Sequence, residues 1–105
     1  MLELNEGYNG HHIEMPIGEE FEICLAENPT TGYKWSLRSS GEPVCVPLGN
    51  DFKTTSAPPG QGGNRYWHFQ VAQAGNANIE LVYQRPWEQD EKQGKRFSLH
   101  VRVPE

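Results

Sequence analysis

Hydrophobic residues recur at every second position along most of the chain, which is the spacing of a β-strand that buries one face. Helical periodicity is hard to find, and turn residues separate the alternating segments. Seven such segments predict an all-β fold, an antiparallel β-sandwich of about seven to eight strands. Their apolar positions are Ile13 and Met15; Phe21, Ile23 and Leu25; Tyr33, Trp35 and Leu37; Val44, Val46 and Leu48; Trp67, Phe69 and Val71; Ile79, Leu81 and Tyr83; and Phe97, Leu99, Val101 and Val103.

Turn and breaker residues refine this picture. Pro47 has no backbone N–H to donate, so the fourth segment is predicted to lie at a sheet edge or a bulge. Asn9-Gly10 is a favoured two-residue hairpin turn, which predicts that residues 2–6 fold back on the first strand. Residues 88–95 are charged and polar, and we expect them to form the most mobile loop.

Composition and charge exclude several classes of protein. The chain has 105 residues, and we expect a single domain over residues 1–105. The net charge is -5 with no basic stripe, so a nucleic-acid partner is not expected. Without a basic amphipathic helix or an apolar run of membrane-spanning length, a membrane partner is not expected either. Glu3 and Asn5 interrupt the first five residues, which predicts a cytosolic protein or a mature domain without its signal peptide.

Reactive side chains are few and scattered. Cys24 points away from the face that Phe21 and Ile23 share, so free thiols are favoured over a disulfide with Cys45. His68 and His100 fall on outward positions of different strands, and a contact between them stays open. Neither a nucleophile–base arrangement nor a zinc-like spacing is visible, so we expect neither an enzyme nor a cofactor.

Three stretches of turn residues stand out between the strands. If the seven strands reverse direction in turn, the loops after the second, fourth and sixth strands emerge at the same end of the sandwich. Loops of this kind on a β scaffold indicate a binding surface rather than an active site. The stretches are Asn28-Pro29-Thr30-Thr31-Gly32-Tyr33, Gly60-Gln61-Gly62-Gly63 and Arg85-Pro86-Trp87.

Each stretch has a distinct physical character. Pro29 fixes its own φ and Gly32 can take a positive φ, which predicts a stiff tip. The glycines of residues 60–63 leave backbone groups bare to pair with a partner strand. Trp87 beside Arg85 has the composition of a binding hot spot. Each stretch has an alternative interpretation. The first would be an ordinary turn, the second a flexible linker, and the third a Trp folded over the sheet edge with Arg85 stacked on it.

In this order, the three stretches resemble the chagasin family, the inhibitors of papain-like cysteine proteases. The resemblance covers the chain from about Ile13 to Val103. It implies a monomeric, reversible, tight-binding inhibitor with an immunoglobulin-like sandwich, whose three loops form a wedge that fills the protease cleft without being cut. It also favours an exported, periplasmic or secreted protein.

The resemblance assigns a role to each loop. Residues 28–32 would lie over the catalytic Cys and His of the protease, with Thr30 and Thr31 at the tip. Residues 60–63 would follow the non-primed side of the cleft, backbone to backbone. Arg85-Pro86-Trp87 would cover the primed side, where Trp87 would meet aromatic residues of the enzyme.

An immunoglobulin-like adhesion or carbohydrate-binding module is the alternative. A sugar platform would need several exposed aromatic rings, and the chain has three tryptophans. By alternation Trp35 and Trp67 face the core, which leaves Trp87 alone on the surface. The inhibitor is therefore the favoured interpretation.

Overall fold

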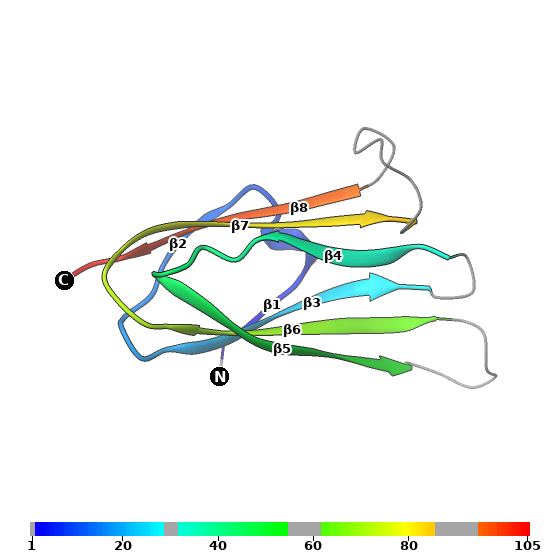
Figure 1. Ribbon diagram of the computed structural model, residues 1–105, viewed down its shortest axis with the longest axis horizontal. Helices are drawn as coiled ribbons and strands as arrows, with labels where there is room; N and C mark the ends of the chain where they lie inside the picture. The colour runs from blue at the N-terminus through cyan, green and yellow to red at the C-terminus, as the bar shows by residue number, and fades with distance from the viewer. Residues whose placement is uncertain (1, 29–31, 55–61, 86–94) are drawn as a thin grey trace.

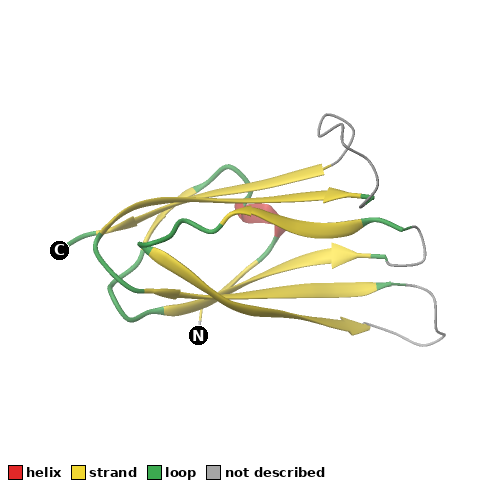
Figure 2. Cartoon of the chain, in the orientation of Figure 1, coloured by secondary structure: helices red, strands yellow, loops and turns green. Residues whose placement is uncertain are grey.

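The computed structural model describes residues 2–28, 32–54, 62–85 and 95–105. These residues form eight strands and a short 3-10 helix, which is red in Figure 2. The strands are β1 (Leu2–Leu4), β2 (His12–Glu14), β3 (Glu20–Glu27), β4 (Lys34–Ser39), β5 (Cys45–Thr54), β6 (Gly63–Val71), β7 (Gly75–Gln84) and β8 (Lys95–Val103), and the helix η1 is Glu6–Tyr8.

The described strands form two four-stranded sheets, in the orders β1-β3-β6-β5 and β2-β8-β7-β4. Pairing is antiparallel within each sheet except at β1–β3 and β2–β8, which are parallel. In Figure 1 the strands run along the long axis, with β8 and β7 above and β6 and β5 below. The predicted all-β sandwich is confirmed, and its strand count lies within the expected range.

The core lies between the two sheets and is built from the alternating apolar positions. Phe21 and Phe69 stack across β3 and β6 with their ring centroids 5.2 Å apart, and both are fully buried. Trp35 and Trp67 are also buried, as their alternation predicted. Because these side chains leave water, their burial is the main contribution to the stability of the fold.

The predicted N-terminal hairpin is wrong. Gly10 does take a positive φ of 80°, but its N–H donates to the carbonyl of Ser98 in β8 rather than closing a hairpin. The Asn9 side chain likewise accepts a hydrogen bond from the Ser98 N–H. The chain crosses between the sheets at η1, so β1 pairs with β3 while β2 pairs with β8. Each short segment thereby extends a different sheet.

The fourth predicted strand lies at a sheet edge and contains a bulge, as Pro47 indicated. The pairing register of β5 shifts between Pro47 and Gly49. The expected inward face is only partly right, because Leu48 is exposed while Cys45 is fully buried. Cys45 and Pro47 lie opposite the buried Val71 and Phe69 of β6, while Val44 precedes the strand, so the inward positions of β5 begin at Cys45 rather than at Val44.

Candidate functional site

The strand ends that flank the three turn-rich stretches lie together at one end of the sandwich. Gly63 pairs with both Glu27 and Thr54, so the first and second stretches adjoin in one sheet. In the other sheet, Gln84 pairs with Lys34, so the first and third stretches adjoin. In Figure 1 the arrowheads of β3, β5 and β7 all point to the right-hand end. The predicted common end is therefore confirmed for these flanking residues.

Two hydrogen bonds join the two sheets at this end. The backbone N–H of Asn28, just after β3, donates to the hydroxyl of Tyr83 in β7 at 3.0 Å. The indole Nε1–H of Trp35 donates to the carbonyl of Ala26 at 2.9 Å. Since Asn28 and Tyr83 belong to strand ends of different sheets, their bond fixes how far apart the sheets lie here.

Aromatic rings extend this bridge to the base of the third stretch. The Tyr83 ring lies 5.0 Å from the ring of Trp35 and 5.4 Å from that of Tyr33, centroid to centroid. The guanidinium carbon of Arg85 lies 4.9 Å from the Tyr33 ring centroid, within the range of a cation–π contact. Tyr33 and Arg85, predicted in separate stretches, are thus in contact, and the cation covers Tyr33.

The first and second stretches also approach each other closely. Gly62 has a φ of 83°, and a Cβ on it would lie 3.0 Å from the carbonyl oxygen of Glu27 and 3.2 Å from the Cβ of Asn28. Only glycine combines this conformation with this approach. Gly32 has the positive φ, 84°, that its place in the first stretch predicted.

Sequence reasoning missed two buried polar residues at this end. Glu27 and Gln84 are the buried polar or charged residues of the described chain, and each is the last residue of a strand that leads into a loop. Glu27 Oε2 accepts a hydrogen bond from Arg65 Nε at 2.6 Å. Gln84 Oε1 has no hydrogen-bond partner among the described residues. The signal was present, because Glu27 continues the inward alternation of Phe21, Ile23 and Leu25.

The predicted site residues divide into two groups. The structure describes Asn28, Gly32, Tyr33, Gly62, Gly63 and Arg85, all of them at the common end. The other predicted residues lie outside the described parts of the chain, as does most of the expected mobile loop at 88–95. They are Pro29, Thr30, Thr31, Gly60, Gln61, Pro86 and Trp87.

The thiols and imidazoles do not form a catalytic arrangement in the described chain. Cys24 and Cys45 are both free, as favoured. Burial raises the pKa of the Cys24 thiol, partly opposed by a hydrogen bond with Tyr66, and burial raises the pKa of Cys45 to about 11. A protonated thiol is a poor nucleophile. His68 and His100 lie in different sheets and do not form the pair that the sequence left open.

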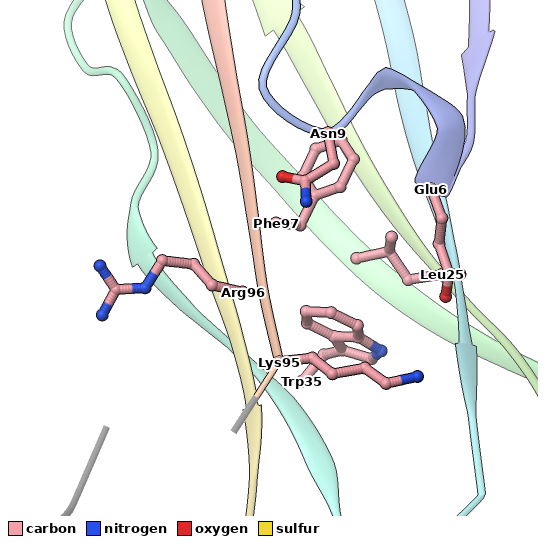
Figure 3. Close-up of a pocket in the computed structure, with 7 residues that line it drawn as sticks. All are labelled: Glu6, Asn9, Leu25, Trp35, Lys95, Arg96 and Phe97. Carbon is pink, nitrogen blue, oxygen red and sulfur yellow. The ribbon is translucent and has the colours of Figure 1, made fainter. Parts of the chain in front are cut away.

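A hollow of about 310 Å³ opens between the sheets beside the common end (Figure 3). Leu25, Trp35 and Phe97 form its apolar part, while Arg96 points away from it in Figure 3. Glu6 and Asn9 on its rim already bond backbone N–H groups. The hollow therefore has the chemistry of a gap between sheets rather than of a reaction centre.

Metal-binding and membrane-spanning features are also absent from the described residues. These residues contain no group of three or more His, Cys, Asp or Glu side chains placed to hold a metal ion. No helix among them has the length and apolar character that a membrane crossing requires. Burial of Trp35 and Trp67 removes two of the three rings that a sugar platform would need.

Comparison with known proteins assigns the chain to a family. Residues 14–101 match the model of the chagasin family of peptidase inhibitors, I42. The chain is 36% identical over 107 residues to Amoebiasin-1 of Entamoeba histolytica, covering 97% of this chain and 99% of that protein. It is 30% identical over 105 residues to Chagasin of Trypanosoma cruzi, covering 95% and 96%. The solution structure of Amebosin is similar with a TM-score of 0.81 at 33% identity, covering 98% and 97%. The chain therefore belongs to the chagasin family, and it is a cysteine-protease inhibitor rather than an enzyme.

Proposed function

We propose that this chain, as a monomeric domain over residues 1–105, blocks the active-site cleft of papain-like cysteine proteases with three adjacent loops. The convergence at one end of the strand ends that flank all three stretches carries the proposal. Three loops that share one end present a single surface, which can bury about 800 Å² on each partner.

The loop roles follow the family resemblance. Residues 28–32 lie over the catalytic Cys and His of the protease, with Thr30 and Thr31 at the tip. Residues 60–63 pair with the non-primed side, and residues 85–87 cover the primed side. The contacts of Asn28, Tyr33 and Arg85 support this assignment, because loop bases held in advance lose little entropy on binding.

The test is a tight-binding titration of papain and a cathepsin-like protease, with a serine protease as the control. Trp87→Ala should weaken binding by about 2–4 kcal/mol, since an aromatic anchor in a pocket is a hot spot. Thr31→Ala should cost about 1 kcal/mol, as expected for a lost hydrogen bond. Ile17→Ala, an exposed apolar residue in the turn between β2 and β3, is the matched control and should leave inhibition unchanged.

Failure of the wild-type protein to inhibit either protease would contradict the proposed function. Equal inhibition by the wild type and Trp87→Ala would contradict the hot-spot assignment alone. An exported location, which the resemblance favours, stays a prediction that fractionation of the source cells would check.

A further inference from the structure

A single guanidinium links the strand ends that carry the first two loops. Arg65 in β6 donates from Nε to Glu27 Oε2 at 2.6 Å and from Nη1 to Asn50 Oδ1 at 2.9 Å. Its Cζ also lies 5.3 Å from the centroid of the Phe52 ring. Glu27 ends β3, while Asn50 and Phe52 belong to β5. Arg65 therefore connects the three neighbouring strands β3, β6 and β5.

The burial of this ion pair points to a role in geometry. The Glu27 side chain is 1% exposed and that of Arg65 is 17% exposed. Removing two charges from water is costly, and apolar residues of similar volume often stabilise a fold as well or better. An apolar pair cannot fix the relative orientation of the two side chains. The planar guanidinium can, because its N–H groups point in set directions and so fix where each acceptor lies.

The strand ends near Arg65 are the points at which the chain enters or leaves the first and second stretches of turn residues. Asn28, the first residue of the first stretch, directly follows Glu27, whose carbonyl oxygen packs against Gly62. Gly63 pairs with Glu27 on one side and with Thr54 on the other. The ion pair between Glu27 and Arg65 therefore lies in the strand ends that adjoin residues 28, 54 and 62.

We propose that Glu27 and Arg65 are positioning residues for inhibition, which hold the first two loops at the separation that lets them occupy a protease cleft without being cut. This inference rests on the proposed function. Neither residue belongs to the loops themselves, and both act through the residues they hold. Loosening them would let a loop extend along the cleft as a substrate does, because an unconstrained loop can adopt the extended conformation that proteases bind.

The experiment uses Arg65→Ala, Arg65→Lys and Glu27→Gln in the full chain, with Val71→Ala as the control. Val71 is a buried residue of the same strand at the opposite end of the sandwich, so its truncation lowers stability without touching the ion pair. Each variant is measured at a temperature where circular dichroism shows it to be fully folded. The readouts are the inhibition constant, the dissociation rate and the mass of the inhibitor after prolonged incubation with papain.

We expect Arg65→Ala to bind about 10- to 100-fold more weakly through faster dissociation, as when a buried charge loses its partner. We also expect papain to cut it within residues 28–32 or 54–62. Arg65→Lys should lie between Arg65→Ala and the wild type, because a point charge cannot bridge both Glu27 and Asn50. Glu27→Gln should weaken inhibition as well, since it keeps an acceptor oxygen but loses the charge.

Val71→Ala should stay uncut and inhibit within about twofold of the wild type, since distant sites act independently. Arg65→Ala that inhibits like the wild type and stays uncut overturns the inference. So does equal weakening and cleavage of Val71→Ala, because destabilisation alone would then explain the effect.

A separate measurement distinguishes this inference from the proposed function. If the wild type inhibits no papain-like protease, the free proteins are digested with a nonspecific serine protease. Faster cutting of residues 28–32 or 54–62 in Arg65→Ala than in Val71→Ala then supports the positioning role. Equal rates in these two variants overturn it.

Discussion

The two ends of the sandwich are held together in different ways. At the end opposite the loops, backbone groups close the turns. The Gly18 N–H donates to the carbonyl of Val71, whose own N–H donates to the carbonyl of Glu19, both at 2.8 Å. The Ala72 N–H donates to the carbonyl of Val44 at the same distance. These bonds join backbone groups, with Gly18 at a positive φ of 93°, and no side chain takes part in them.

At the loop-bearing end, side chains hold the strand ends. The described contacts there include the Glu27–Arg65 ion pair, the Asn28–Tyr83 hydrogen bond and the stack of Arg85 on Tyr33. A loop that must offer its backbone to a partner cannot use the same groups to close its own turn. The difference between the ends therefore indicates that a binding end is fixed from beneath, by side chains under its loops.

The largest expected effect is a loss of stability in the body of the sandwich that leaves inhibition by the loop-bearing end unchanged. Phe69→Ala removes a fully buried ring that stacks on Phe21 near the end opposite the loops. It should lower the free energy of unfolding by about 3–5 kcal/mol. Urea titration measures this loss. The folded fraction should inhibit papain as the wild type does, because no loop contact changes.

Phe69→Leu is the milder control, since it leaves a smaller cavity and a protein that folds more readily. If the inhibition constant of either variant weakens in parallel with its stability, the two ends are not independent. The comparison between them would then be wrong.

The second prediction uses high pH to destabilise the end of the sandwich opposite the loops. Burial raises the pKa of Cys45 from 9.0 to about 11, so the folded state binds the proton more tightly than the unfolded state. Its contribution is fully present below pH 9 and is lost as the pH rises through 11. Stability should fall by about 2 kcal/mol from this group between pH 9 and pH 11, and by about 3 kcal/mol in total once the pH is well above 11. Denaturant titrations at a series of pH values measure the slope.

Cys45→Ala is the matched variant for the pH series. It lacks the Cys45 thiol but keeps every other ionisable side chain, so its stability should fall less steeply between pH 9 and pH 11. Equal slopes in the two proteins would show that Cys45 does not titrate with a raised pKa.

The smallest effect tests the bridge between the sheets. Tyr83→Phe keeps the ring between Trp35 and Tyr33 but removes the hydroxyl that accepts from the Asn28 N–H. The unfolding free energy should fall by about 1 kcal/mol, and amide exchange at Asn28 should become faster. Tyr8→Phe, at an exposed ring, should change stability by less than about 0.5 kcal/mol. Unchanged exchange at Asn28 in Tyr83→Phe would contradict the bridge.

Much of the fold and part of the site were predictable from local pattern. Alternation placed Trp35 and Trp67 in the core, and Pro47 marked a bulge on an edge strand. Counting strands placed the flanks of the three stretches at one end, because antiparallel neighbours reverse direction at each turn. These predictions succeed because the buried face of a strand and the turns at its ends depend on residues that are neighbours in the sequence.

The sequence by itself determined which residues form strands, which faces are apolar and in what order the loop motifs occur. Only the tertiary structure decided that the N-terminal segments join different sheets, that Cys45 rather than Leu48 faces inward, and that Glu27 meets Arg65 across 38 residues of chain. Short segments and buried charges find their partners by three-dimensional fit, since the energy that selects a partner exists only once distant strands are brought together.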